Sequence, residues 1–298
     1  MENQNTTSPV EQAASVTVQD KNNEEILRAK YDRKIIMDAL EKGSLCCLPD
    51  ASGYADTSRA RNIVSNTNYK GVSLLLVKQH AKENGFPTND YVTFEGVSSM
   101  NEKLNLSWND RMKVIKDSKG VSISYSKETE NPDGTKSREP EHVRLFNVAQ
   151  LENSAKAHDY DVITKHERTE YVKKQVEAEG KNFSPRSSNK EVADIVCSST
   201  KAEEYLGQYF AAVSSGAKFK VSPEQASAFK KNFYDSIYLQ NEKGKINPFN
   251  LNVICTKANA YCKDYLRNLD GKNVEKQKPQ QTQQKKQNQN VDYESPSF

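Results

Sequence analysis

The order of polar and hydrophobic positions predicts a surface loop that runs directly into a buried helix. Residues 61–77 read RNIVSNTNYKGVSLLLV, so a run rich in Asn, Ser and Thr meets four aliphatic residues. The polar run cannot bury its own backbone groups, whereas residues 74–77 belong in a core. We therefore expect a loop fixed at a buried anchor, where binding sites are often found.

The helix after this loop is predicted to continue to Glu83 and to end at Asn84 and Gly85. Helical spacing places four residues inward, namely Leu74, Leu75, Val77 and Ala81. Lys78 and Lys82 fall on the outer face, which reads equally well as a solvated surface or as part of a basic patch.

Helical spacing also predicts a first amphipathic helix from Asn23 to about Gly43, with Asn23 as its N-cap. Residues 1–22 are mostly polar and cannot bury enough apolar surface to become ordered. We predict that they form a disordered arm.

Alternating residues predict a β-hairpin further along the chain. In KVIKDSKGVSISYSK, residues 113–127, a basic turn leads into a strand in which Val121, Ile123 and Tyr125 alternate with serines. The turn signal NPDG at residues 131–134 and the segment HVRLFNV complete the hairpin. The pattern of residues 91–104 fits either a short strand or the start of a helix.

The pattern from residue 153 to 269 is helical. One helix is expected after a capping box at Ser188 and Glu191, with these residues on one face: Val192, Ile195, Ser199, Ala202, Leu206, Tyr209 and Val213. Further helices are expected at Ser222–Pro223 and at Asn247–Pro248, and we interpret all three apolar stripes as core.

These elements predict an α+β fold. Its parts are a disordered arm (1–22), a small α/β module with a β-hairpin or a small antiparallel sheet (23–152), a helical region of unassigned role (153–270) and a disordered Gln/Lys-rich tail (271–298). The lysines of the tail fit a soluble linker better than a set of phosphate contacts.

Composition narrows the class of protein. The chain has no run of roughly 20 apolar residues and no signal-peptide pattern, so we expect no membrane association and a cytoplasmic location. Five cysteines without a CxxC pair fit free thiols in a reducing compartment. We interpret four of them as small core residues, Cys46, Cys47, Cys255 and Cys262.

The residue patterns of common enzymes are missing. The four histidines form no HExxH pair, since the position four after His166 is Glu170, and no phosphate loop, dinucleotide-binding motif or GxSxG elbow is present. We therefore expect neither enzyme activity nor a metal or other cofactor.

Charge is distributed unevenly along the chain. The net charge is only +3, but Arg59 to Lys119 contains ten basic residues against six acidic ones. A nucleic-acid surface would therefore be a local patch. Trp108 and Arg111 could provide a stacking site in this region, although a lone tryptophan is more often a core residue.

The segment ARNIVSNTNYKGVSLLLV resembles the N-terminal single-stranded-DNA-binding domain of the antirestriction ArdC family. That family's core reads approximately R-N-x-x-[ST]-x-x-x-Y-x-G-x-[NS]-x-L-L-L. The matching residues are Arg61, Asn62, Ser65, Tyr69, Gly71 and Ser73, followed by the aliphatic run that contains Leu74 to Leu76. The segments IMDALEKG, TF, VIKDSKGVSISY and LFNVAQ resemble further family elements in the same order. The resemblance covers about residues 25–152 and does not extend to the HExxH-containing peptidase half.

Two departures from the family pattern concern DNA binding. Asp117 stands where the family turn has its first glycine, which puts a negative charge beside Lys116 and Lys119. The tryptophans that often follow the first helix of the family are absent, since residues 44–52 read SLCCLPDAS.

The resemblance implies a non-enzymatic, largely sequence-independent binder of single-stranded DNA, encoded on a mobile element or phage and acting in DNA transfer, replication or antirestriction. The candidate DNA-binding residues are Arg61, Asn62, Tyr69, Lys70, Gly71, Ser73, Lys113, Lys116 and Lys119. In this interpretation the Tyr69 ring stacks on a base and Gly71 lets the strand approach the backbone.

The roles of single residues have alternatives. The Asn62 side chain could equally well contact a base edge or cap the loop. Without the resemblance, Tyr69 and Gly71 would read as a tight turn packed under the first helix.

A second interpretation makes the chain a protein-interaction or scaffold module with a degenerate DNA-binding domain. The terminal sequence DYESPSF loosely resembles the tips by which bacterial single-strand binding proteins recruit partners. Replication or transfer proteins are therefore candidate partners of the C-terminal tail.

Overall fold

The computed structural model describes residues 9–130, 133–180 and 193–287, and the side chains of residues 23–125, 128–130, 133–137, 141–180 and 193–269. The helices are α1 (Pro9–Glu41), α2 (Gly71–Asn84), α3 (Phe94–Lys103), α4 (Ala155–Ala178), α5 (Ala202–Ser215), α6 (Pro223–Ile237) and α7 (Asn250–Gln287). The strands are β1 (Tyr54–Ala55), β2 (Arg61–Asn62), β3 (Asp90–Thr93), β4 (Lys113–Val114), β5 (Val121–Glu130), β6 (Lys136–Asn147), β7 (Leu151–Glu152), β8 (Ile195–Val196) and β9 (Phe219–Lys220). The predicted α+β class is confirmed.

The largest sheet has the strand order β2-β3-β6-β5. β5 and β6 form the predicted antiparallel hairpin, in which Val121 lies opposite Leu145. β3 pairs antiparallel with β6, whereas β2 pairs parallel with β3, so the sheet is mixed. Two small sheets, β1-β9-β8 and β4-β7, join segments that are distant in the sequence.

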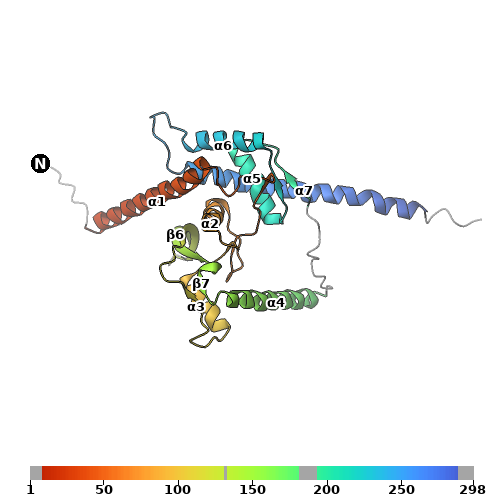
Figure 1. The fold of residues 1–298 in the computed structure, drawn as a ribbon, viewed down its shortest axis with the longest axis horizontal. Helices are drawn as coiled ribbons and strands as arrows, with labels where there is room; N and C mark the ends of the chain where they lie inside the picture. The colour runs from red at the N-terminus through yellow and green to blue at the C-terminus, as the bar shows by residue number, and fades with distance from the viewer. Residues whose placement is uncertain (1–8, 131–132, 181–192, 288–298) are drawn as a thin grey trace, which may run out of the picture.

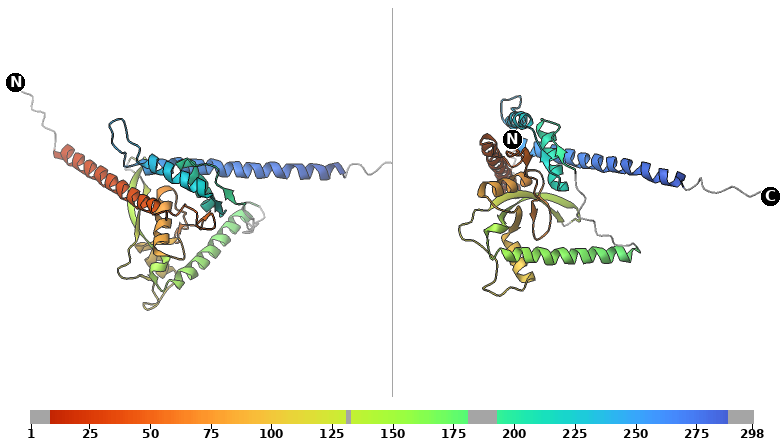
Figure 2. Two further views of the ribbon diagram at one scale, coloured as in Figure 1. Left: turned by 45° about the horizontal axis from the view of Figure 1, so that its top comes forward. Right: turned by 45° about the vertical axis from the view of Figure 1, so that its right-hand side comes forward.

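The sheet separates two hydrophobic cores. Adjacent residues of a strand point to opposite faces, and β3 places Tyr91 in the larger core and Val92 in the smaller one. The larger core lies among α1, α2 and the C-terminal helices, and the smaller one includes residues of α3 and α4. Figure 1 and Figure 2 show α5, α6 and α7 on one side of the sheet and α3 and α4 on the other.

Aromatic rings fill the larger core where α5 meets α6. The rings of Tyr205 and Phe229 stack with their centroids 3.8 Å apart, and Phe233 stacks on Phe229 at 5.2 Å. Cys46 and Cys47 are buried in the same core, as the sequence predicted.

The helix predicted after the central loop is α2, which ends as expected with Gly85 in the left-handed conformation at φ 64°. The outward placement of Lys78 was wrong. Its side chain is fully buried, and its Nζ lies 2.8 Å from both Asp56 Oδ2 and the Ser58 carbonyl oxygen. The segment before β2 covers this face of α2, which the helical pattern alone does not reveal.

Other helices differ from their predicted limits mainly at their starts. α1 begins at Pro9, well before Asn23, and a proline suits a first helical position because the N–H it lacks would be unpaired there. α5 begins only at Ala202, because Ile195 pairs with Phe219 in a sheet. The capping box predicted at Ser188 and Glu191 lies outside the described residues.

The capping box at the start of α6 is confirmed, with Ser222 and Gln225 bonded reciprocally. α7 begins at Asn250, and the Asn247 side chain accepts a bond of 3.0 Å from the Phe249 N–H. α7 continues to Gln287, beyond the boundary predicted at Gly271, and residues 288–298 lie outside the described part.

The ambiguous segment 91–104 contains both elements. β3 ends at Thr93, whose hydroxyl oxygen accepts a bond from the Gly96 N–H and so caps α3. Within the described residues, no helix combines the length and apolar character that crossing a bilayer requires.

Candidate nucleic-acid interface

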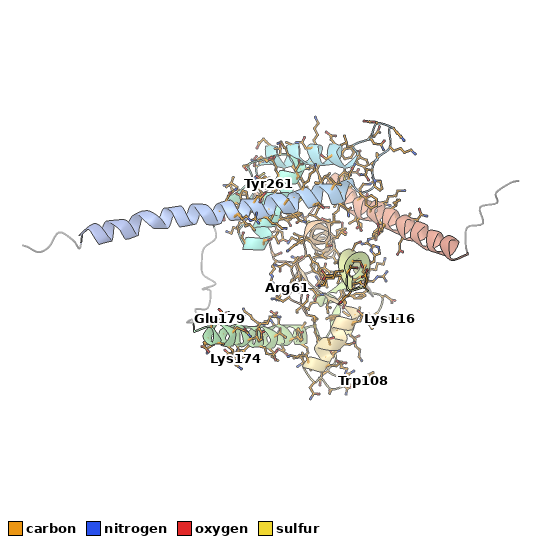
Figure 3. The ribbon with its side chains drawn as sticks, turned by 180° about the vertical axis from the view of Figure 1, so that it is seen from behind. Arg61, Trp108, Lys116, Lys174, Glu179 and Tyr261 are labelled. Atoms are coloured by element: carbon orange, nitrogen blue, oxygen red, sulfur yellow. The ribbon has the colours of Figure 1, made fainter. Side chains whose placement is uncertain are left out.

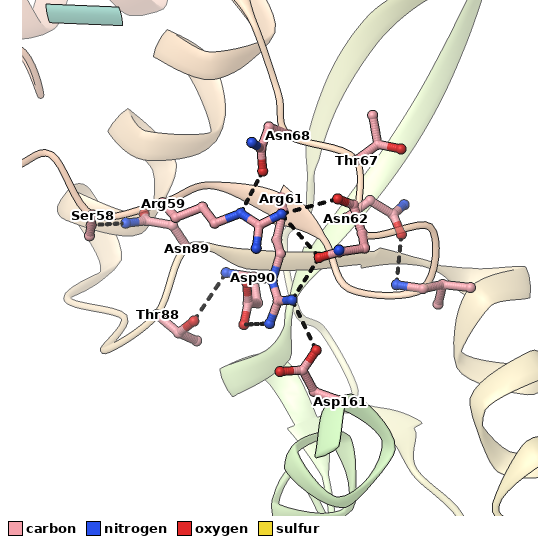
Figure 4. A network of polar contacts seen from close by, with 12 residues as sticks. Ser58, Arg59, Arg61, Asn62, Thr67, Asn68, Thr88, Asn89, Asp90 and Asp161 are labelled. Carbon is pink, nitrogen blue, oxygen red and sulfur yellow. Dashed lines mark hydrogen bonds and ion pairs between the residues drawn. The ribbon is translucent and has the colours of Figure 1, made fainter. Parts of the chain in front are cut away.

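Arg61 fixes the central loop to two other elements. Its Nε donates to Asp90 Oδ1 on β3 at 2.8 Å, and its Nη1 donates to Asp161 Oδ1 on α4 at 2.9 Å. Nη1 also donates to Asn66 Oδ1 at 2.8 Å, within the loop itself. Figure 4 shows this network, in which the guanidinium lies between the two carboxylates. The Arg61 side chain is only 12% exposed, so a DNA phosphate could not replace these partners without opening the loop.

The charges of this network are mutually stabilised. Burial acts to lower the pKa of Arg61, but its hydrogen bonds with Asp90 and Asp161 raise that pKa overall. The hydrogen bond from Arg61 is also the main cause of a lowered pKa at Asp161. Arg61 therefore stays charged, and its single positive charge offsets one of the two negative charges of Asp90 and Asp161.

Asn62 caps the loop, which was one of its two predicted roles. Its side-chain oxygen accepts bonds from the backbone N–H groups of Val64 at 2.9 Å and Ser65 at 3.1 Å. Ser73, on α2, donates to the carbonyl oxygen of Ser124 on the hairpin at 3.2 Å. Both side chains are therefore occupied in the fold.

Tyr69 and Gly71 also make internal contacts. The Tyr69 ring packs against the larger core, edge-on to Tyr91 at 6.3 Å, and burial raises the pKa of its hydroxyl. Gly71 is buried with φ 57°, and a Cβ there would lie 2.9 Å from Asn259 Nδ2 on α7. The backbone gap predicted to admit a DNA strand is filled by α7. Lys70, between them, is exposed.

The predicted lysines Lys113, Lys116 and Lys119 lie on β4 and the turn that follows it, and all three are exposed. The backbone of this turn is fixed, since the Lys119 carbonyl oxygen lies 2.9 Å from His80 Nε2 and accepts a bond of 3.1 Å from Gln150 Nε2. Asp117 has φ 64°, a left-handed conformation that suits the glycine of the family turn. The lysines are not gathered around Arg61: Lys119 lines a groove beside α1, whereas Arg61 lines a different one beside α4.

The groove beside α4 was not predicted from the sequence. It has a volume of about 760 Å³ and lies between the central loop, the segment that leads into β3, and α4. We call it the loop–α4 groove, and its charged lining residues are Arg59, Arg61, Asp90, Asp161, Lys165 and Arg168. Asp161, Lys165 and Arg168 are spaced four and three residues apart on α4 and so share one face of the helix. This spacing is the one sequence signal that could have indicated the groove. It begins 100 positions after Arg61, so the sequence alone does not connect the two.

The loop–α4 groove carries a positive surplus. Four basic side chains line it against two carboxylates, and Arg61 already contacts both carboxylates. Arg59 is exposed and is held by Asn68, which accepts from its Nε at 2.6 Å. Lys165 is exposed, and Arg168 donates to Thr164 Oγ1 at 3.3 Å and lies 3.8 Å from Asp161. Such a groove attracts a polyanion.

A second groove, of about 1080 Å³, lies between α1 and the hairpin. Its charges are more evenly balanced, with Arg28, Lys119 and Arg144 against Glu24 and Glu83. Arg28 is also paired with Asp32 at 2.9 Å. This groove is therefore a weaker candidate for phosphate binding than the loop–α4 groove.

Among the residues with described side chains, no three His, Cys, Asp or Glu residues are grouped so that they could hold a metal ion. Besides Asp90 and Asp161, the loop–α4 groove presents cations, hydroxyls and amides, which are groups that bind anions.

Comparison with known proteins points to one family. Two crystal structures of the antirestriction ArdC protein from the R388 plasmid are similar: the metal-free one at 13% identity with a TM-score of 0.43, and the Mn(II)-bound one at 12% and 0.45. Each alignment covers 79% of this chain and 95% of the ArdC chain. No curated protein matches the sequence. The family model described as the N-terminal domain of anti-restriction factor ArdC matches residues 33–184, which is just over half of the chain and includes α4. The chain therefore belongs to the ArdC N-terminal domain family.

Proposed function

We propose that this protein binds single-stranded DNA along the loop–α4 groove, without enzymatic activity, in the antirestriction or DNA transfer of a plasmid or another mobile element. The observation that carries the proposal is the surplus of cations in that groove. Family membership supports the biological context, since the similar R388 protein is described as antirestriction ArdC.

The chemistry of the groove favours contacts with the DNA backbone. Arg59, Lys165 and Arg168 can pair with successive phosphates, since the four basic side chains of the groove outnumber its two carboxylates, both of which Arg61 contacts. The neutral lining residues Ser58 and Thr88 can add hydrogen bonds to phosphate or sugar oxygens. Backbone contacts carry no sequence information, so we expect little sequence preference.

A titration with a fluorescently labelled oligonucleotide tests the proposal. The double variant Arg59→Ala/Lys165→Ala should bind at least about tenfold more weakly at low salt. It should also reduce the slope of log K against log salt by about 1.4, since each lost single-strand phosphate contact accounts for about 0.7. Far-UV circular dichroism would check that the variant remains folded.

A matched control removes two cations elsewhere. Lys231 on α6 and Lys243 in the following loop are exposed, and Lys231→Ala/Lys243→Ala should leave both affinity and salt slope nearly unchanged. Equal behaviour of the two double variants, or binding that does not depend on salt, would exclude the loop–α4 groove as the DNA site.

Exposed apolar side chains on α4 favour a second candidate function, the protein-interaction module. Val162, Ile163 and Tyr171 are 52%, 43% and 65% exposed. If the oligonucleotide titration shows no binding, a pull-down of host replication proteins would test this candidate. The wild-type chain would be compared with the variant Val162→Ser/Ile163→Ser.

A further inference from the structure

Trp108 stands out among the large side chains because 71% of it is exposed. The sequence favoured a core position for this residue, and that interpretation was wrong. Burying an indole ring is strongly favourable, so a ring left in water at a fixed position is a common feature of binding surfaces. In Figure 3, Trp108 is labelled at the end of the molecule formed by α3 and its following loop, away from Arg61.

Two cations lie against the Trp108 ring. Lys113 Nζ is 4.8 Å from the ring centroid, and Arg111 Cζ is 5.9 Å from it. Both distances are within the range of cation–π attraction. Lys116 is exposed further along the same segment, which also carries the exposed carboxylates of Asp110 and Asp117.

The loop that presents Trp108 is firmly held. Asn101 accepts from the Met112 N–H at 2.8 Å and donates to the Met112 carbonyl oxygen at 2.9 Å, and the Met112 side chain is buried. Asn153 donates to the Arg111 carbonyl oxygen at 3.2 Å. Because these bonds fix the backbone, the ring needs little ordering when a ligand binds.

We propose that Trp108 is a stacking platform for an unpaired base, with Lys113 and Arg111 contacting the adjacent phosphates of the same strand. This inference rests on the proposed function and adds a second contact surface outside the loop–α4 groove. A nucleotide matches the site in both of its parts, since its base has a flat face and its phosphates are anionic. An apolar protein side chain would cover the ring but would not pair with the cations.

The chain offers a direct readout, because Trp108 is its only tryptophan. Tryptophan fluorescence of the full chain, excited where tyrosine absorbs weakly, is followed during titration with an unlabelled oligothymidylate. We expect the emission to be quenched with the same midpoint as the anisotropy change of a labelled oligonucleotide. A duplex with the same number of phosphates should produce much less quenching, because its bases are already stacked.

Variants separate stacking from charge. Trp108→Ala should weaken binding about fivefold or more while the salt slope stays the same, because a stacked base releases no counterions. Trp108→Phe should retain most of the affinity. Tyr234→Ala, which removes an exposed ring from α6, should have no effect.

The two proposals fail in different ways. If anisotropy shows binding while Trp108 emission is unchanged and Trp108→Ala binds normally, the stacking platform is excluded and the proposed function stands. If anisotropy shows no binding even at low salt, both proposals are excluded.

Discussion

Arg61 joins three parts of the chain through one guanidinium. It contacts Asn66 in its own loop, Asp90 on β3 and Asp161 on α4. Each contact is partly shielded from water, since the side chains of Asp90 and Asp161 are 24% and 23% exposed. The strength of such a cluster depends on geometry, because desolvation offsets much of the attraction.

We expect Arg61→Ala to lower the free energy of unfolding by about 1–3 kcal/mol at neutral pH. This range is below that of a fully buried ion pair, because water still reaches Arg61 and its carboxylate partners. The pKa of Asp161 is held below its usual value of 3.8, chiefly by the hydrogen bond from Arg61. When the pKa of a carboxyl group is lower in the folded state, its full stabilising effect is present at pH values above its unfolded-state pKa. The effect is lost as the pH falls through the folded-state pKa. The difference in free energy of unfolding between wild type and variant, measured with urea, should therefore shrink below about pH 4.

Arg61→Lys is the matched control for this prediction. It keeps the charge but lacks the forked donor geometry, so its stability should lie between wild type and Arg61→Ala. An alanine variant as stable as wild type at pH 7 would show that the cluster does not hold the loop.

The residues that sequence reasoning placed correctly are those whose neighbours are close in sequence. Leu74, Leu75 and Cys46 are buried as the local pattern predicted. Lys78 was misplaced because its partner Asp56 lies 22 positions earlier and covers the helix only in the folded chain. The motif at Arg61 and Tyr69 correctly indicated the family, but a motif cannot show whether its side chains face solvent or the interior.

At the scale of elements, α5 and α7 approach closely at Gly207. A Cβ at this position would lie 2.6 Å from Tyr261 Cδ1 and 3.0 Å from the Ala258 carbonyl oxygen. Gly207 is in the middle of α5, where glycine has the poorest helix propensity apart from proline. The close approach of α7 explains why a glycine is present here.

We expect Gly207→Ala to destabilise the protein by about 1–3 kcal/mol through overpacking, despite the better helix propensity of alanine. The midpoint of urea unfolding would measure this change. Adding Tyr261→Ala should recover part of the loss, so the double variant should be more stable than the sum of the single effects predicts. Strict additivity would mean that Tyr261 is not the obstacle.

Elements with strong local signals were predictable, and elements made by distant pairing were not. The hairpin follows from alternation around a turn, and α6 from its capping box. β8 was predicted as part of a helix because Ile195 fits both the helical and the strand spacing of apolar residues. Only its pairing with Phe219 decides between the two. The loop–α4 groove was missed for the same reason, since two of its cations come from a helix remote from the loop.

At the scale of the whole molecule, the larger core combines both halves of the chain. It includes Ile36 and Leu75 from the first half and Tyr209 and Ile254 from the second. The family match ends at residue 184, so α5, α6 and α7 complete a core that begins inside the matched region. The predicted domain boundary near residue 153 stays a prediction.

A truncation tests how far the halves depend on each other. A fragment of residues 23–152 should lose cooperative thermal unfolding, because it exposes core leucines that each contribute about 1.5–3 kcal/mol when buried. A fragment of residues 23–269 keeps both cores and should melt cooperatively. Thermal unfolding is measured by circular dichroism. A sharp transition of the shorter fragment would show that the first half folds alone.

The five free cysteines are all buried, and burial raises the pKa of Cys46 to about 11 and also that of Cys47, Cys197, Cys255 and Cys262. Since the thiolate is the reactive form, the closed protein offers almost none to an alkylating agent or oxidant at neutral pH. Modification must wait for the chain to open, and the order in which the five sulfur atoms react would report which region opens first.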